Sequence, residues 1–288
     1  MDTPSKNHPA DHLMAALEQV GNPACVGLDP VLDRLPASCR AGAQPLAAIE
    51  RFCLGVLDAI SGHVGVCKIQ SACFERYGAA GVEVIDTIGS RAGELGLQVI
   101  LDYKRGDIGI SAEHYAASAR GRCDWVTVNP YLGVDGIAPF VAADSLGAFA
   151  LVRTSNPGGD AIQSNRLEDG RTVAQSVADL VASHGEATIG RCGYSALGAV
   201  VGATKREDAE ELRRRMPRQI FLVPGFGAQG GGVDDVLPCF NSDGAGAIIT
   251  ASRSVLYAFE TEDPEWQSGV ERAARDLGDS LAKGMGTR

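Results

Sequence analysis

The residues best suited to chemistry stand close together in the segment Asp102 to Ile108 (DYKRGDI), at the end of an apolar stretch. Successive side chains of a β-strand point to opposite faces, so Asp102 and Lys104 lie on the same face, roughly 6.6 Å apart along the strand. A carboxylate and an ammonium group therefore point into one pocket. An ion pair at a strand end is also a common structural feature, so this pair alone does not identify a catalytic site.

Two more charged residues strengthen the case for a site. Lys68 stands near the end of the preceding apolar stretch, and Asp107 follows a glycine just beyond Lys104. The four side chains form an alternating set of two acids and two amines, and protein interiors rarely bury four charges without a function. Only five of the 26 basic residues are lysines. A lysine within an apolar stretch therefore needs a specific reason, and its ammonium, unlike a guanidinium, can act as a compact acid.

A second group of residues is typical of a phosphate site. The glycine-rich segment 224–231 (PGFGAQGG) exposes backbone N–H groups, and Arg253 follows the next apolar stretch in ASRS. Backbone N–H groups and a planar guanidinium are the donors that bind phosphate best. A glycine-rich turn alone is usually only a turn. Its pairing with Arg253 indicates phosphate binding.

Eight short stretches rich in Val, Ile and Gly must position these residues, and we predict that each is a buried strand. They span residues 24–29, 64–70, 98–104, 125–130, 148–155, 198–204, 219–225 and 246–252. Segments with helical spacing lie between them. This alternation predicts parallel strands with right-handed crossovers, and eight repeats favour a (β/α)8 TIM barrel over a doubly wound sheet.

Polar residues follow most of the predicted strands, and that end of the strands carries the chemistry of a TIM barrel. They are Asp29, Lys68, Asp102, Lys104, Asn129, Thr154, Ser155, Thr204, Ser252 and Arg253. The glycine-rich turn and Arg253 come after strands seven and eight, where such barrels usually hold phosphate. The sequence therefore predicts one polar rim that contains the whole site.

The flanks of the barrel are predicted to be additions to one domain that spans residues 1–288. Residues 1–22 are expected to form a helix over the bottom of the barrel, and residues 264–288 a closing C-terminal helix. Two segments, 156–171 and 224–234, are long enough to act as lids.

Composition argues against several other classes of protein. A net charge of −10 and a pI near 5.0 argue against a nucleic-acid surface. No apolar run approaches the ~20 residues that cross a bilayer, and the N-terminus lacks the pattern of a signal peptide, so we expect a cytoplasmic protein without membrane contact. The eight cysteines are scattered, and we expect reduced, mostly buried thiols. His63 and His114 lack the partner spacing of a zinc site or a triad, and we predict no metal site.

Taken together, these motifs resemble the orotidine 5'-phosphate decarboxylase family. The shared motifs are the D-x-K-x-x-D-I run in its bacterial form D-x-K-R-G-D-I, the lysine of KIQSACFE, SNPG, PGFGAQGG and the arginine of ASRSV. They follow one another in consistent strand order from about residue 24 to 258. The resemblance implies a TIM barrel that decarboxylates orotidine 5'-phosphate to UMP and CO2, the last step of de novo UMP synthesis, without a cofactor or metal.

The resemblance also implies roles for individual residues. Lys104 would stabilise the C6 carbanion formed as CO2 leaves and then protonate it, while Asp102 would face the substrate carboxylate. Lys68 and Asp107 would complete the charge array and hold ribose hydroxyls, with Asp107 entering from the neighbouring subunit of a homodimer. The implied substrate-binding residues are Asp29 for ribose, Ile108 for the pocket that receives CO2, Ser111 at a position that is often threonine, Ser155 for the pyrimidine edge, Gln229 and Arg253 for phosphate, and Pro224 at the start of the phosphate loop.

Two features depart from the family pattern. Ser252 precedes the phosphate arginine where many members have glycine, which affects a backbone contact to phosphate. The segment 156–171 is also long relative to compact members.

Two alternative functions stay open at this point. A magnesium-dependent sugar-phosphate decarboxylase or aldolase of the same superfamily shares the D-x-K-x-x-D run, but it would use acids to hold the metal where this chain has Lys68. A catalytically silent nucleotide-binding barrel is the other alternative, and the intact set of four charged residues argues against it.

Overall fold

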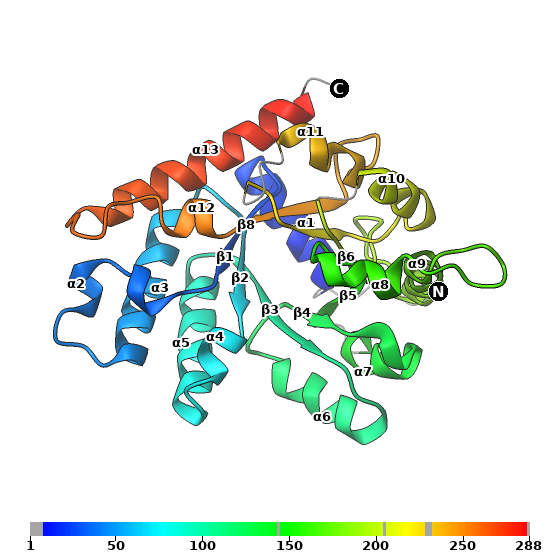
Figure 1. Cartoon of the computed structure of the whole chain (residues 1–288), viewed down its shortest axis with the longest axis horizontal. Helices are drawn as coiled ribbons and strands as arrows, with labels where there is room; N and C mark the ends of the chain where they lie inside the picture. Colours follow the sequence, from blue (N-terminus) through cyan, green and yellow to red (C-terminus); the bar gives the residue numbers. More distant parts are fainter. Residues whose placement is uncertain (1–7, 143–144, 204–205, 228–231, 287–288) are drawn as a thin grey trace.

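The computed structural model describes residues 8–142, 145–203, 206–227 and 232–286. Eight parallel strands close into a barrel in sequential order, and helices surround it (Figure 1). The strands are β1 (Ala24–Leu28), β2 (Val66–Gln70), β3 (Gln98–Arg105), β4 (Trp125–Val128), β5 (Gly147–Arg153), β6 (Leu197–Val201), β7 (Phe221–Pro224) and β8 (Ala247–Ala251). The TIM-barrel prediction is confirmed, and the doubly wound alternative is wrong.

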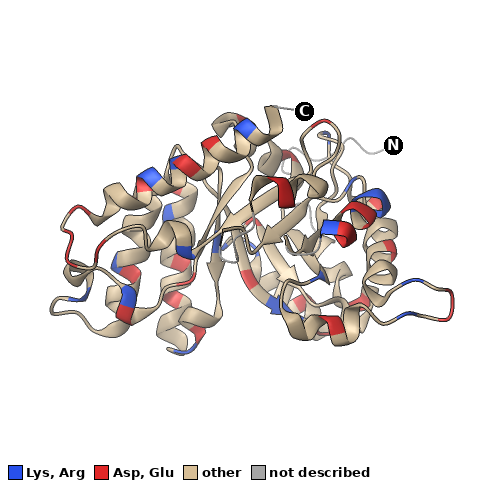
Figure 2. Cartoon of the chain, turned by 45° about the horizontal axis from the view of Figure 1, so that its top comes forward, with Lys and Arg blue, Asp and Glu red and all other residues tan. Residues whose placement is uncertain are grey.

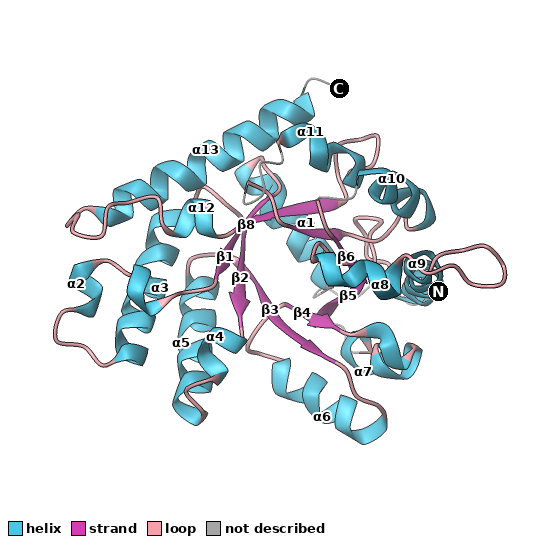
Figure 3. Ribbon diagram, in the orientation of Figure 1, coloured by secondary structure: helices cyan, strands magenta, loops and turns pink. Residues whose placement is uncertain are grey.

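Most of the helices form an outer ring around the strands (Figure 3). The longer ones are α1 (Pro9–Val20), α3 (Pro45–Ile60), α5 (Ala79–Glu94), α6 (Gly109–Ala119), α9 (Val173–Gly185), α10 (Arg206–Arg215) and α13 (Trp266–Gly286). Six helices have only four residues each: α2 (Ala37–Arg40), α4 (Ala72–Glu75), α7 (Ala138–Val141), α8 (Asp160–Gln163), α11 (Val233–Val236) and α12 (Arg253–Leu256). In the described parts of the connections after β4 and β7, only short helical turns stand in place of full helices.

Local sequence explains where the longer helices begin and which face they bury. Pro45 starts α3, a position where its missing N–H is not needed. A capping box starts α9, in which Thr172 accepts from the backbone of Gln175 and the Gln175 side chain accepts from the backbone of Thr172. Apolar residues three and four positions apart, such as Phe52 and Val56 of α3, are buried against the barrel.

Two apolar cores result, one outside and one inside the barrel. The outer core lies between strands and helices and includes Phe52, which packs against Trp266 of α13 with ring centroids 5.2 Å apart. The inner core includes Leu13 and Leu17 of α1 together with the inward-facing residues of the strands. α1 therefore covers the bottom of the barrel and α13 packs outside it, so the expected N- and C-terminal extra helices are present. Residues 1–7 of the first predicted segment and 287–288 of the second lie outside the described residues.

The base of the inner core is filled by two stacked aromatic rings. Trp125 and Phe149 have ring centroids 4.5 Å apart and are fully buried. A methyl group on Gly147 would lie 2.4 Å from the Trp125 ring, and one on Gly198 would lie 2.6 Å from Phe149. The two glycines therefore make room for the rings, which form a solid floor beneath the rim.

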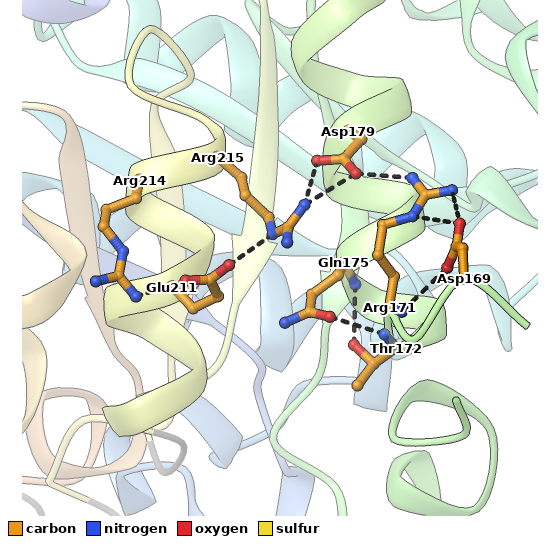
Figure 4. Close-up of polar contacts among 8 residues, drawn as sticks. All are labelled: Asp169, Arg171, Thr172, Gln175, Asp179, Glu211, Arg214 and Arg215. Atoms are coloured by element: carbon orange, nitrogen blue, oxygen red, sulfur yellow. Dashed lines mark hydrogen bonds and ion pairs between the residues drawn. The ribbon is translucent and has the colours of Figure 1, made fainter. Parts of the chain in front are cut away.

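The segment 156–171 is held at both ends. Gln163 bonds with both the backbone and the hydroxyl of Thr154, and the buried Arg153 pairs with Asp160 at 2.7 Å. At the other end, Arg171 bonds with Asp169 and Asp179, as Figure 4 shows. The lid expectation is not tested by these contacts, but they fix the base of the segment beside α9.

Charged residues of both signs are interspersed over the outer helices (Figure 2). Within the described residues, no helix is long and apolar enough to cross a membrane. All eight cysteines are free, and five of them are buried. Burial raises the pKa of Cys25 to about 12, so this thiol stays protonated, as the sequence led us to expect.

Candidate active site

A pocket of about 330 Å³ opens at the C-terminal ends of the strands. All eight strands, or the loops that directly follow them, contribute lining residues: Asp29, Lys68, Gln70, Asp102, Lys104, Thr127, Leu151, Thr154, Ser155, Asn156, Val200, Leu222, Pro224, Gly225, Phe226, Thr250, Ser252 and Arg253. The predicted polar rim is therefore a single site. Asn129 does not line the pocket and instead accepts a hydrogen bond from the backbone of Tyr131. Thr204, also predicted on the rim, lies outside the described residues.

Three charged side chains form the centre of the pocket. The Asp102 carboxylate receives Lys68 Nζ on Oδ2 at 2.9 Å and Lys104 Nζ on Oδ1 at 2.5 Å. Asp102 and Lys68 are each only 6% exposed, whereas Lys104 reaches into the open part of the pocket with 47% of its side chain exposed. The buried pair of Lys68 and Asp102 thus holds the accessible ammonium group of Lys104 in place.

These contacts set the protonation states of the array. Burial raises the pKa of Asp102, but the charges of Lys68 and Lys104 outweigh it and hold that pKa at about 2. Burial lowers the pKa of Lys68, but Asp102 outweighs it and the net shift is upward. At neutral pH Asp102 is therefore ionised and Lys68 is protonated.

Lys104 adopts a conformation that an undistorted strand would not give it. Its φ is +48°, in the left-handed region, and the pairing of β3 with β4 shifts register between Leu101 and Arg105. Such a conformation costs a non-glycine residue about 1 kcal/mol or more and persists only where neighbours hold it. The predicted meeting of Asp102 and Lys104 is confirmed, although the strand between them is not regular.

Thr127 of β4 is the neighbour that holds this irregular segment. Its hydroxyl donates to Asp102 Oδ1 at 2.8 Å and accepts from the Lys104 backbone N–H at 3.0 Å. On the other side, Arg105 pairs with Glu75 of α4, which also accepts from Ser71. Sequence reasoning missed Thr127. The available signal was its position two residues after Trp125, which places a polar side chain on the inward face of the strand.

The strands of the opposite wall present apolar side chains, whereas the polar residues Thr154, Ser155 and Asn156 follow β5 at its rim. Leu151 of β5, Val200 of β6 and Leu222 of β7 line it and belong to the inner core. Apolar walls exclude water, and a charge interaction is stronger where the local dielectric constant is low. The charges of Lys68, Asp102 and Lys104 therefore face an apolar surface across the pocket.

The remaining predicted ligand residues mostly lie where the sequence placed them. Asp29, Ser155, Pro224 and Arg253 line the pocket, while Gln229 lies outside the described residues. Oδ1 of Asp29 is buried without a hydrogen-bond partner. Among the described residues, the exposed guanidinium of Arg253 has no ion-pair partner. A carboxylate oxygen and a guanidinium are thus available to a ligand.

Asp107, Ile108 and Ser111 lie outside this pocket. Asp107 Oδ1 accepts from the backbone N–H of Ile108, and Ile108 and Ser111 are exposed at the start of α6. One chain alone therefore brings Lys68, Asp102 and Lys104 together, but not Asp107. Across the described residues, no group of three or more His, Cys, Asp or Glu side chains is arranged to hold a metal ion.

Comparison with known proteins gives consistent results. The model of the orotidine 5'-phosphate decarboxylase / HUMPS family matches residues 23–264. Orotidine 5'-phosphate decarboxylase of Rhodopirellula baltica is 41% identical, over 94% of this chain and 98% of that protein. The protein of the same name from Clostridium novyi is 37% identical, over 87% of this chain and 89% of that one.

Solved structures show the same similarity. The structure of Leishmania donovani OMP decarboxylase is 28% identical with a TM-score of 0.80, and the match covers 96% of this chain and 98% of that one. Leishmania donovani UMP synthase is 30% identical with a TM-score of 0.81, over 96% of this chain and 56% of that one.

Proposed function

This chain belongs to the orotidine 5'-phosphate decarboxylase / HUMPS family, and from that premise we propose a mechanism in which Lys104 is the catalytic acid. The chain is a carboxy-lyase that converts orotidine 5'-phosphate to UMP and CO2, a reaction that fits a role in UMP biosynthesis. As an enzyme of nucleotide biosynthesis, it is proposed to act in the cytoplasm.

The observation that carries the mechanism is the accessible Lys104 ammonium fixed by a buried carboxylate. In the reaction the bond between C6 and the carboxylate carbon breaks, CO2 leaves, and the electron pair stays on C6. This carbanion has no conjugated sink, so a cation placed beforehand must stabilise it. Lys104 is proposed to provide that charge and then to donate a proton from Nζ, which forms the new C6–H bond.

Asp102 is proposed to serve this step in two ways. Its ionised carboxylate orients Lys104 through the 2.5 Å contact, and it faces the position of the substrate carboxylate. Repulsion between the two carboxylates is relieved as CO2 leaves, so this contact favours the transition state over bound substrate. Lys68 keeps Asp102 ionised in its buried position.

The rest of the pocket is proposed to bind the nucleotide. Asp29, whose buried Oδ1 has no hydrogen-bond partner, is proposed to accept from a ribose hydroxyl. Ser155 lines the pocket and is proposed to read the pyrimidine edge. Arg253 is proposed to bind the phosphate together with Gln229 and the loop that starts at Pro224. Binding of the phosphate contributes energy that the reacting ring cannot supply by itself.

We also propose a homodimer with shared sites. Asp107, Ile108 and Ser111 would enter the pocket of a second copy, because they do not line their own. The surface around them supports this arrangement, since Ile108, Ile110 and Tyr131 are 54%, 69% and 85% exposed. Exposed apolar side chains gathered on one surface commonly mark an interface.

The function is tested by turnover of orotidine 5'-phosphate in excess EDTA. We expect UMP to form at an undiminished rate, because the proposed chemistry uses only the side chains of the pocket. A strict magnesium requirement would favour the sugar-phosphate alternative, and tight UMP binding without turnover would favour the silent barrel. The relatives argue against the first alternative, since those compared are named for the decarboxylase.

The shared site is tested by co-expression of a Lys104→Ala chain with an Asp107→Ala chain. In a mixed dimer one site carries both changes and the other carries neither, whereas both sites of each homodimer are damaged. Random pairing makes half of the dimers mixed, so about a quarter of wild-type activity should return. Activity no higher than that of the separate variants, in a sample shown to contain the mixed dimer, would contradict the shared site.

A further inference from the structure

Ser252 is a polar residue of the pocket wall that the mechanism does not use. It directly precedes α12 and lines the pocket beside Arg253. A serine at this position often caps the helix with its hydroxyl, but here the side chain makes no capping hydrogen bond. Its hydroxyl has no hydrogen-bond partner among the described residues.

The neighbouring strand leaves room for this side chain. A methyl group built on Gly27 of β1 would lie 2.2 Å from Oγ of Ser252 and 3.3 Å from its Cβ, and 3.4 Å from Oδ1 of Asp29. Real Cβ atoms do not approach an oxygen as closely as 2.2 Å, so the hydroxyl occupies this position only because residue 27 is glycine. The hydroxyl and the unpartnered Asp29 oxygen therefore flank the same small space.

The backbone holds both residues in place. The carbonyl of Ser252 accepts from the N–H groups of Val255 and Leu256 at 3.0 and 2.8 Å. One turn later, the Tyr257 hydroxyl donates to the Asp29 carbonyl at 3.3 Å and accepts from the Val31 N–H at 2.8 Å. The ends of β8 and β1 are thus tied to each other, and the backbone of Ser252 is held in place.

We propose that Ser252 is an additional nucleotide-binding residue, whose hydroxyl donates a hydrogen bond where the ribose meets the phosphate, between Asp29 and Arg253. The inference rests on the proposed nucleotide site. Ser252 would thus add a side-chain donor at this strand end, and the glycine at position 27 leaves room for it.

The test measures UMP binding by titration calorimetry and turnover of orotidine 5'-phosphate for Ser252→Ala and Ser252→Cys. Both should weaken UMP binding about tenfold, the loss expected for one hydrogen bond to a charged group, with a smaller change in kcat. Cysteine keeps the size of serine but is a weak donor, so it separates hydrogen bonding from space filling. Ser268→Ala on the exposed surface of α13 is the matched control and should bind UMP like the wild type.

A double-mutant cycle tests the pairing with Gly27. Gly27→Ala should weaken UMP binding at least as much as Ser252→Ala, because the new methyl group displaces the hydroxyl. In a Ser252→Gly background the same Gly27→Ala change should cost little, since the next contact, Asp29 at 3.4 Å, is an ordinary one. Equal effects in both backgrounds would overturn the pairing.

The possible outcomes distinguish the proposal for Ser252 from the proposed function on which it rests. Wild-type turnover with unchanged UMP affinity in Ser252→Ala and Ser252→Cys would overturn the inference alone. A loss in Ser252→Ala that Ser252→Cys restores would also overturn it, because the serine would then only fill space. Absence of turnover by the wild type would overturn the proposed function alone, and absence of UMP binding by the wild type would overturn this inference as well.

Discussion

The two walls of the pocket are built from the same kind of parallel strand, but one presents charged side chains and the other apolar ones. The wall from β2 to β4 carries Lys68, Asp102 and Lys104 in direct contact, whereas the wall from β5 to β7 presents Leu151 and other apolar side chains. The charged wall is fixed by hydrogen bonds before any ligand binds. The apolar wall supplies shape and a low dielectric constant. The charged groups of the reaction are therefore concentrated in the half of the rim formed by β2 to β4, and single substitutions in each wall test this division.

The largest effect on kcat is expected from removal of the accessible ammonium group of Lys104. Lys104→Ala should lower kcat at least about 10³-fold, because removal of one preorganised group typically costs 10² to 10³ and here the proton donor is lost as well. UMP binding should persist, since Asp29 and Arg253 stay in place. Steady-state kinetics and UMP titration check both parts. Substantial turnover by this variant would contradict the mechanism.

Asp102, the buried carboxylate of the charged wall, should contribute to the free energy of unfolding. Asp102→Asn leaves the Lys68 ammonium buried without a carboxylate, and breaking such a pair costs about 3 to 5 kcal/mol of the free energy of unfolding. Because folding lowers the pKa of Asp102 to about 2, its contribution is complete above its unfolded pKa near 3.8 and is lost as pH falls through 2.

Urea unfolding at several pH values checks this prediction. The difference in the free energy of unfolding between the wild type and Asp102→Asn should be constant from pH 7 to about pH 5. It should shrink below about pH 4. Asp33→Asn, a change of an exposed carboxylate, is the control and should stay within about 0.5 kcal/mol. A difference that grows as pH falls would contradict the assignment of Asp102 as an ionised buried group.

A smaller effect is expected on KM from a change of Arg253, the residue proposed to bind the substrate phosphate. Arg253→Ala should raise KM about 100-fold, near 2.7 kcal/mol, because a charge-assisted contact to a phosphate is lost. Added guanidinium ion should restore part of the rate, since it can take the vacated position. Arg272→Ala on the exposed surface is the control. A KM equal to that of the wild type would place the phosphate elsewhere.

The smallest effect is expected on the apolar wall. Val200→Thr conserves volume and introduces a hydroxyl, so kcat/KM should fall less than about tenfold, or 1.4 kcal/mol. Val201→Thr places the same change on the outer face of the strand, where it should lower stability and leave kinetics unchanged. If Val200→Thr were as damaging as Lys104→Ala, the division between a charged and an apolar wall would be wrong.

Sequence alone determined the architecture and most of the site. Eight apolar stretches in alternation with helices predicted the barrel, and strand-end positions placed Asp29, Lys68, Asp102 and Arg253 on one rim. These inferences succeed because burial and side-chain alternation are local properties of a strand, and because the carboxyl ends of parallel strands meet at one end of a barrel.

Only the tertiary structure decided which side chains of neighbouring strands contact each other at the site. The left-handed conformation of Lys104 depends on Thr127 of β4, and the position of Ser252 depends on Gly27 of β1. Each of these contacts joins residues far apart in the chain, and it is set by the relative stagger of two strands. That stagger follows from closure of the whole barrel, so no single segment of the sequence encodes it.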